Sequence, residues 1–135
     1  RGLHFQTRHP QGKLVRAVSG RVYDVAVDLR NGSKTFGKYY GVVLDSEQQN
    51  QFYIPEGFAH GFYVLSDFAV FAYKCTDFYH PEDEGGLMWN DSSICIDWKS
   101  VAPDVIPLTS EKDQRHPLFS AEKKYFDINA NWIGE

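Results

Sequence analysis

The sequence predicts an all-β jelly roll with a short helical tail at its C-terminal end. Short β-rich runs follow one another, and turn signals separate them at roughly the 8–12-residue spacing of a sandwich or barrel. The chain of 135 residues has room for one domain with its own core. Hydrophobic residues make up 42% and charged residues 24%, which is typical of a globular protein and excludes a disordered one.

Four strands are expected in the first half of the chain, at residues 13–18, 21–28, 38–44 and 51–54. The first ends at Ser19-Gly20 and the second follows at once, which predicts a hairpin. Along the second strand, residues 22, 24, 26 and 28 share one face, and residues 23, 25, 27 and 29 share the other. Asn31-Gly32 marks the turn before the third strand, and the polar stretch 45–50 separates the third from the fourth.

Four more strands are expected in the second half, at residues 60–65, 68–76, 87–89 and 94–98. Pro55-Glu56-Gly57 predicts a tight turn before the first of them. The second is strongly apolar and aromatic, which favours a central position in a sheet. Gly85-Gly86 predicts a break in the chain before the last two.

Only residues 110–126 have helical character. Ser110 can cap a turn that has Asp113 at its third position. Pro117 limits the length of any helix that follows. We therefore expect one short helix in the tail.

Charge and composition exclude several classes of protein. The net charge is −4, which argues against a broad nucleic-acid-binding surface, and no run approaches the roughly 20 apolar residues of a membrane span. Cys75 and Cys95 are too few for a disulfide framework, so we expect two small buried side chains in a reducing cytoplasm. Aromatic residues, at 16%, suit a sandwich interior and also a pocket that stacks on a base or a sugar.

His4 is the first candidate for chemistry. Alternation in the opening Arg-Gly-Leu-His-Phe-Gln string puts Leu3 and Phe5 on one face and His4 on the other. An imidazole suits proton abstraction near neutral pH if a carboxylate holds its tautomer, although a lone strand histidine is more often structural.

His60 is the second candidate. The string that ends at His60, Pro-Glu-Gly-Phe-Ala-His, resembles the second motif of cupins, Pro-x-Gly-x-x-His, which implies a double-stranded β-helix with this histidine in the barrel mouth. Metal cupins add a His-x-His pair, which this sequence lacks, and the early candidates are His4 and His9 alone. Two ligands are too few for a divalent site, so we expect no metal and a His60 that donates a hydrogen bond or carries a proton.

Other polar side chains have both an ordinary and a chemical interpretation. Tyr73 and Tyr79 lie in and just after the aromatic strand, where tyrosine is usually packed, although a phenol in a cavity can donate a proton. Lys13 begins a strand and is either an exposed cation or an inward ammonium that stabilises an enolate oxygen. Asp113 fits a first-turn carboxylate that the helix dipole favours.

Five strings occur together in the sequence. They are Arg-Gly-Leu-His-Phe-Gln, Gln-Gly-Lys-Leu-Val-Arg, Val-Tyr-Asp-Val-Ala-Val-Asp-Leu-Arg, Pro-Glu-Gly-Phe-Ala-His-Gly-Phe and Ser-Glu-Lys-Asp. Together they resemble the dTDP-4-dehydrorhamnose 3,5-epimerase family, in the family's order and roughly its spacing, from residue 1 to about residue 119.

The resemblance implies a role for each candidate residue. His4 matches the general base, Asp113 the carboxylate that pairs with it, and Tyr73 the proton donor on the opposite face of the sugar. Lys13 matches the lysine near the keto oxygen, and His60 the second active-site histidine. Positions that bind the ligand or line its pocket are matched by Arg1, Tyr79, Glu84 and Lys112.

The activity implied by the resemblance is inversion of C3 and C5 of dTDP-4-dehydro-6-deoxy-D-glucose through an enolate, without a cofactor. The implied partners are the dTDP-sugar and a second copy in a homodimer, with no nucleic acid and no membrane. The family has a pocket-lining segment before the first motif, so we expect residues 1–135 to be one cupin-like domain that lacks N-terminal strands. The alternatives are a 3-epimerase of another dTDP-4-keto-deoxysugar, a metal-dependent cupin enzyme and a non-catalytic sugar-binding jelly roll.

Overall fold

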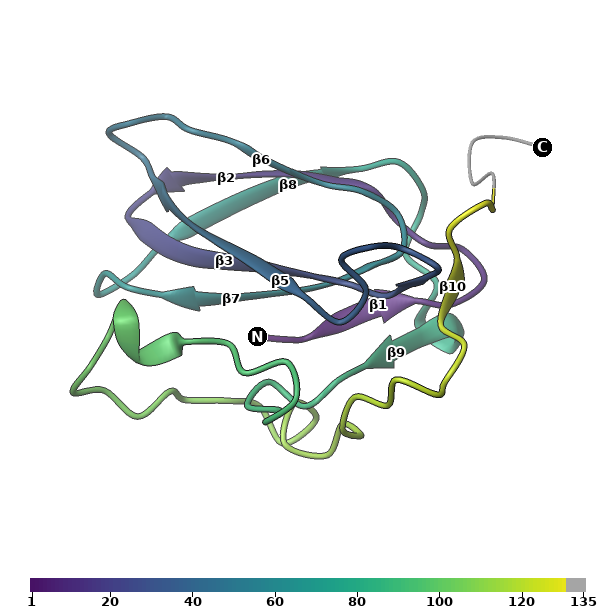
Figure 1. Ribbon diagram of the computed structural model, residues 1–135. Helices are drawn as coiled ribbons and strands as arrows, with labels where there is room; N and C mark the ends of the chain where they lie inside the picture. Colours follow the sequence, from purple (N-terminus) through teal and green to yellow (C-terminus); the bar gives the residue numbers. More distant parts are fainter. Residues whose placement is uncertain (131–135) are drawn as a thin grey trace.

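The computed structural model describes residues 1–130 as two facing β-sheets (Figure 1). The elements are β1 (His4–Gln6), β2 (Lys13–Ser19), β3 (Arg21–Asp28), β4 (Arg30–Asn31), β5 (Tyr39–Asp45), β6 (Phe52–Ile54), β7 (Phe58–Val64), β8 (Val70–Cys75), η1 (Pro81–Asp83), β9 (Glu84–Gly86), η2 (Trp98–Ser100) and β10 (Phe126–Asp127). One sheet has the strand order β5-β3-β7-β1-β9, the other has the order β6-β2-β8, and β10 pairs with β4. The predicted all-β jelly roll is confirmed, and residues 131–135 of the expected domain lie outside the described residues.

β3 is buried along both of its faces because the five-stranded sheet is covered on both sides. Val22 and Ala26 belong to the core between the two sheets. Val25 and Val27 belong to a second core, together with side chains of the C-terminal segment. Figure 1 shows this segment, in green and yellow, running along the outside of the five-stranded sheet. The alternation expected along residues 22–29 is therefore confirmed, with an apolar environment on each side.

The expected hairpin between β2 and β3 is wrong, because the two strands lie in different sheets. β2 pairs with β6 and β8, whereas β3 pairs with β5 and β7. The chain turns the corner at Gly20, which has a φ of 76° and lies so close to the Phe68 carbonyl that a Cβ would overlap it. The Ser19-Gly20 signal thus marks a passage between the sheets.

The late strands also differ from the expected ones. Residues 87–89 and 94–98 form no strand, with Trp98 beginning η2, and β9 forms instead over the Gly85-Gly86 pair that was expected to break the chain. Glycine fits there because β9 lies against β1, where a Cβ on Gly85 would overlap Phe5. β8 is an edge strand and not a central one, since it pairs only with β2 among the described residues. Its aromatic side chains face a cavity, which explains why the strand is apolar without being central.

The expected C-terminal helix is wrong as well. Residues 110–126 contain two separate turns and no helix. In the first turn the Asp113 N–H donates to Ser110 Oγ at 3.1 Å, so the cap is present without a helix. No helix follows the first turn, since Pro117 cannot donate to a helix and its carbonyl accepts from the Met88 N–H at 2.8 Å.

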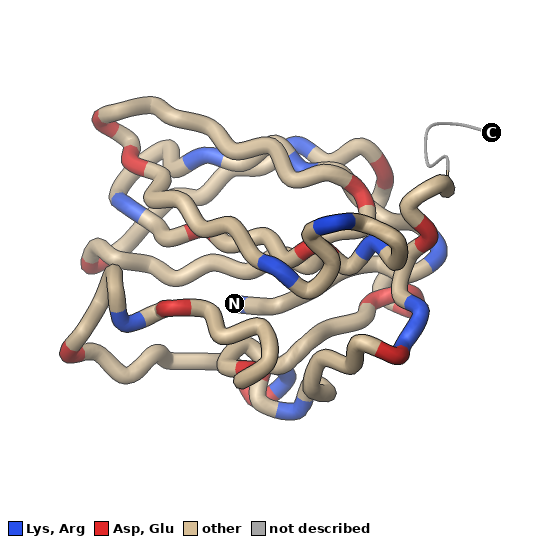
Figure 2. Tube along the Cα trace, viewed as in Figure 1, with Lys and Arg blue, Asp and Glu red and all other residues tan. Residues whose placement is uncertain are grey.

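The two cysteines are free and exposed, so the expectation of buried thiols is wrong. Cys75 ends the edge strand β8 and its side chain lines the cavity between the sheets, and Cys95 lies in an irregular segment with a φ of 56°. Acidic and basic residues are interspersed along the trace in Figure 2. No helix in residues 1–130 has the length and apolar character needed to cross a membrane.

Candidate functional site

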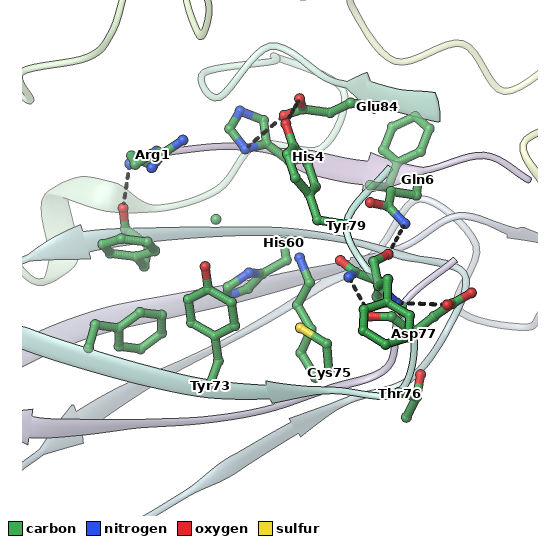
Figure 3. Close-up of a pocket in the computed structure, with 17 residues that line it drawn as sticks. Arg1, His4, Gln6, His60, Tyr73, Cys75, Thr76, Asp77, Tyr79 and Glu84 are labelled. Carbon is green, nitrogen blue, oxygen red and sulfur yellow. Dashed lines mark hydrogen bonds and ion pairs between the residues drawn. The ribbon is translucent and has the colours of Figure 1, made fainter. Parts of the chain in front are cut away.

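A cavity of about 810 Å³ opens between the two sheets (Figure 3). β1 and β7 supply one wall, β2 and β8 supply the other, and the chain after β8 contributes to the rim. Seven of the nine predicted site residues line it, namely Arg1, His4, Lys13, His60, Tyr73, Tyr79 and Glu84. The other two, Asp113 and Lys112, bind side chains that line it.

His4 reaches the cavity because β1 alternates as predicted, with Leu3 and Phe5 in the core on the opposite face. Its Nε2–H donates to Asp113 Oδ1 at 2.7 Å, across 109 positions of sequence. Nδ1 then carries the lone pair and lies 3.8 Å from Glu84, a cavity residue. Burial lowers the pKa of His4 despite the hydrogen bond to Asp113, so the imidazole is neutral near neutral pH and can accept a proton.

Asp113 is almost completely buried, with 1% of its surface exposed. Burial alone would raise the pKa of this carboxyl group, but the interactions with His4 and Ser110 outweigh burial and hold the pKa below its ordinary value. The carboxylate is therefore ionised and can fix the tautomer of His4 and stabilise its protonated form.

His60 lies on β7 directly opposite His4 of β1 in the strand register. Its Nε2 lies 2.8 and 3.0 Å from the two carboxylate oxygens of Asp24, which is fully buried on the inward face of β3. Burial raises the pKa of Asp24, and the bond to His60 offsets this rise only in part. Alternation along the strand assigns Asp24 to the face of Val22 and Ala26 but indicates no partner for it. A carboxylate on the same inward face as Val22 and Ala26 requires a hydrogen-bonding partner, and this requirement could have indicated the Asp24–His60 pair.

Lys13 lies on β2 in register with Cys75 of β8, and both side chains line the cavity. Burial lowers the pKa of the ammonium group, and nearby Cys75, Asp24 and Glu84 offset this only in part. Of the two predicted alternatives, an exposed cation or an ammonium group inside the cavity, Lys13 is the second.

Tyr73 points into the cavity from β8, beside Phe71, whose ring centroid lies 6.1 Å away (Figure 3). Its side chain is 60% exposed, so its phenol is open to a ligand and is not a packed core group. Phe71 also stacks near His60, at 6.3 Å between centroids. These rings give the three-stranded side of the cavity an apolar floor.

Glu84 gathers the remaining predicted residues at the rim. It accepts hydrogen bonds from Tyr79 at 2.9 Å and from the Lys112 ammonium at 2.5 Å. These bonds outweigh the effect of burial and lower the pKa of Glu84. Arg1 lines the same cavity, and its carbonyl accepts from the Phe62 N–H at 2.9 Å.

Gln6 is a functional residue that sequence analysis did not single out. Its amide nitrogen donates to the Phe78 carbonyl at 3.2 Å, and its oxygen accepts from the His80 N–H at 2.8 Å. Asp83 holds the other end of this loop through Thr7 and neighbouring backbone N–H groups. The loop that carries Phe78 and Tyr79 to the rim is therefore tied to β1 at two points.

His116 is a second residue that sequence analysis missed. Its ring meets the His4 ring edge to face at 5.3 Å between centroids, and its Nε2 lies 3.8 Å from Asp113 Oδ1. The sequence indicated His4 and His9 as the early metal-ligand candidates, but His9 stacks on His80 at 4.1 Å. The structure instead brings His4, Asp113 and His116 together as three possible ligands.

The two walls of the cavity offer different chemistry. The five-stranded sheet presents a neutral imidazole held by a carboxylate, and the three-stranded sheet presents a phenol and an ammonium group. Facing sheets lie about 10 Å apart, so a six-membered ring between them would turn one face to each sheet. This arrangement can remove a proton from one face, return one to the other and stabilise an oxyanion.

Comparisons with known proteins agree with this chemistry. Residues 1–121 match the family described as dTDP-4-dehydrorhamnose 3,5-epimerase. The chain is 54% identical over 114 residues to the dTDP-4-dehydrorhamnose 3,5-epimerase of Methanothermobacter thermautotrophicus, covering 84% of this chain and 61% of that protein. It is also 54% identical over 120 residues to the Pseudomonas aeruginosa enzyme of the same name, covering 89% and 65%. The chain thus spans less than two thirds of the length of these relatives.

Two crystal structures resemble the whole described fold. A dTDP-4-dehydrorhamnose 3,5-epimerase from Elizabethkingia anophelis has 56% identity and a TM-score of 0.83, covering 93% of this chain and 67% of that one. A dTDP-6-deoxy-D-glucose-3,5-epimerase from Legionella pneumophila, in complex with dTDP-4-keto-L-rhamnose, has 48% identity and a TM-score of 0.87, covering 96% and 69%.

Proposed function

Because the chain belongs to the dTDP-4-dehydrorhamnose 3,5-epimerase family, we propose that it inverts C3 and C5 of dTDP-4-dehydro-6-deoxy-D-glucose to give dTDP-4-dehydro-L-rhamnose. The single observation that carries this proposal is the His4–Asp113 pair on one wall of a cavity whose other wall holds Tyr73. Residues 1–135 act as one cupin-like epimerase domain in this proposal.

The substrate explains why two opposed groups are needed. C3 and C5 both flank the C4 carbonyl, so loss of a proton from either carbon gives an enolate. A single base would return the proton to the face it came from. Inversion requires removal by His4 Nδ1 on one face and return by the Tyr73 hydroxyl on the other. The electron pair of the broken C–H bond is held in the enolate and then forms the new C–H bond on the opposite face, so no electrons are gained or lost and the reaction needs no redox cofactor.

The enolate oxygen requires stabilisation, which the cavity can provide. Lys13 offers a partly desolvated ammonium group, and its charge acts more strongly there than in water. His60 offers a ring fixed by Asp24, as either a hydrogen-bond donor or a proton carrier. Arg1, Tyr79, Glu84 and Lys112 are assigned to the nucleotide-sugar at the rim, where Glu84 already links Tyr79 to Lys112.

Solvent exchange tests the proposal directly. In deuterium oxide, the full chain should incorporate deuterium at C3 and C5 of the substrate, and His4→Ala should abolish this incorporation. Tyr73→Phe should still exchange deuterium but should no longer invert the centres. Equal loss of exchange and inversion in Tyr73→Phe would contradict the two-face scheme. Deuterium exchange that survives in His4→Ala would show that His4 is not the base.

The same experiment separates the alternatives. A 3-epimerase would exchange and invert at C3 only, which proton NMR of the product reveals. A sugar-binding jelly roll would bind the nucleotide-sugar without exchange. A metal-dependent cupin enzyme would lose its activity on treatment with a chelator, whereas the proposed proton transfer would continue.

The remaining assignments concern partners and location. We infer a homodimer, in which pairing between copies would protect edge strands such as β8 and β5. Light scattering of the purified chain tests the dimer. A cytoplasmic location fits the two free cysteines, and fractionation of cells that express the chain tests it.

A further inference from the structure

One side chain that lines the cavity and two that do not form a cluster that the proposed reaction does not use as a unit. His4, Asp113 and His116 each offer one ligand atom, and these atoms lie within 4.8 Å of one another. Two imidazoles and one carboxylate are a donor set that suits zinc and other first-row transition metals. His4 of β1 lines the cavity, whereas Asp113 and His116, on the segment after Ser110, are not among its lining residues.

Two polar atoms of this cluster are buried and lack an ordinary hydrogen bond. Among residues 1–130, Asp113 Oδ2 and His116 Nε2 form no hydrogen bond of ordinary geometry. Ser110 and the Gly2 N–H lie near enough to lower the pKa of the Asp113 carboxyl group, whose residue is 1% exposed. Unsatisfied buried polar atoms are unfavourable, by about 1–3 kcal/mol each in typical cases. Their position beside one another and beside His4 indicates a ligand that accepts electron pairs from all three side chains.

The fold fixes His116 in this place. Its ring lies against Gly86 of β9 so closely that a Cβ on that residue would overlap the ring. The other side of the ring meets His4 edge to face. Gly86 pairs with His4 in the sheet, and its lack of a side chain leaves room for the His116 ring, which lies beside the buried Asp113 carboxylate.

We propose that His4, Asp113 and His116 form an inhibitory site for a transition metal ion of the zinc type. A tetrahedral metal with ligands at about 2.0–2.1 Å places its ligand atoms about 3.3 Å apart. His4 Nε2 and Asp113 Oδ1 are 2.7 Å apart, and His116 Nε2 and Asp113 Oδ1 are 3.8 Å apart. Shifts of about 0.5–0.6 Å suffice for these two pairs, the two imidazole ligand atoms lie within 4.8 Å of each other, and water can complete the coordination.

The metal would disable the base without entering the sugar cavity. This consequence depends on the proposed function, in which Nδ1 of His4 accepts the proton. A metal on Nε2 replaces the proton that is now shared with Asp113, and that proton moves to Nδ1. Nδ1–H can donate to Glu84 but can no longer accept from the substrate. Inhibition should therefore lower kcat and leave KM unchanged.

Binding is tested first, with Co²⁺ and Zn²⁺ as probes on the full chain without an affinity tag. Co²⁺ should give visible d–d absorption at one equivalent per chain, and Zn²⁺ should displace it. His116→Ala and His116→Gln should weaken binding about 10- to 100-fold or more. His9→Ala is the matched control, because it removes an imidazole from the other close histidine pair and should change nothing.

Inhibition is tested second, by deuterium incorporation with and without Zn²⁺. Wild-type protein should lose at least about tenfold in kcat on addition of Zn²⁺, whereas His116→Ala and His116→Gln, each compared with its own metal-free rate, should lose less than about twofold. Mg²⁺ should have no effect, because it prefers oxygen ligands. Circular dichroism confirms that each variant is folded before it is compared.

Each outcome decides a different point. Absence of one-equivalent Co²⁺ binding, or equal binding by the His116 variants, overturns the site. Binding without inhibition overturns the inhibitory role. Absence of deuterium exchange in metal-free protein refutes the proposed function, while the Co²⁺ spectrum still tests the metal site.

Discussion

Replacement of Asp113 by Asn should slow the reaction about 100-fold. The substitution keeps the shape of the side chain and removes its charge, so His4 loses the ionised partner that lies 2.7 Å from Nε2. Hydrogen bonds to charged groups contribute about 1.5–3 kcal/mol, which corresponds to about 10- to 150-fold in rate. Because Asp113 is 1% exposed, water cannot replace the lost charge, and the upper part of this range is expected.

The assay is the initial rate of deuterium incorporation at C3, divided by the folded fraction from denaturation of the same sample. Asp91→Asn is the matched control, because Asp91 is also buried and its carboxylate accepts the N–H groups of Ser93, Ile94 and Phe119. This control should lose stability and keep its rate per folded molecule. If Asp113→Asn retains more than about a third of the wild-type rate, Asp113 does not support the base.

Three further predictions concern the forces that hold the site and the fold. The pKa of Asp28, which accepts two hydrogen bonds at 2.9 Å from the Arg30 side chain, lies at about 2 and below its ordinary value of 3.8. This carboxylate therefore contributes stability above pH 4 that is lost as the pH falls toward 2. Between pH 6 and pH 2.5, the free energy of unfolding measured in urea should fall by up to about 2 kcal/mol less in Asp28→Asn than in wild type. Equal decreases in the two proteins would refute this. Asp24→Ala should leave the buried ring of His60 without its partner and lower the free energy of unfolding by about 1–3 kcal/mol in urea, whereas an unchanged midpoint would mean that the pair contributes nothing. Gly86→Ala should reduce stability by about 1–3 kcal/mol through overlap with the neighbouring imidazole, and a double-mutant cycle with that ring removed should restore most of the loss; additive effects would place the strain elsewhere.

Local pattern predicted the parts of the fold that one strand determines. Alternation along residues 22–29 assigned each side chain of β3 to its face, and alternation around His4 separated the imidazole from Leu3 and Phe5. The turn signals at Asn31-Gly32 and Pro55-Glu56-Gly57 also stand at real turns. These features depend on neighbours in sequence, so the sequence contains the information directly.

Pairing between distant segments could not be predicted in the same way. The Ser19-Gly20 signal is the same for a hairpin as for a corner between sheets, and only the competing partners β6, β8, β5 and β7 decide between them. Residues 110–126 have helical propensity, but their apolar side chains and Asp113 are needed against the five-stranded sheet, and tertiary contacts outweigh the propensity. The Asp24–His60 pair and the position of His116 arise from the same long-range packing.

The proposed site residues are divided between two sheets, so their relative positions depend on how the sheets pack. His4 and His60 are fixed to each other by the β1–β7 register, and Lys13 and Tyr73 by the β2–β8 register. The relative position of these two pairs depends on how the sheets pack, through the core that contains Val22, Ala26 and their neighbours. Because inversion requires both faces of the sugar and exchange requires one, a change in sheet packing should harm inversion before it harms exchange. In the proposed reaction, the jelly roll would thus place the two proton transfers on different sheets.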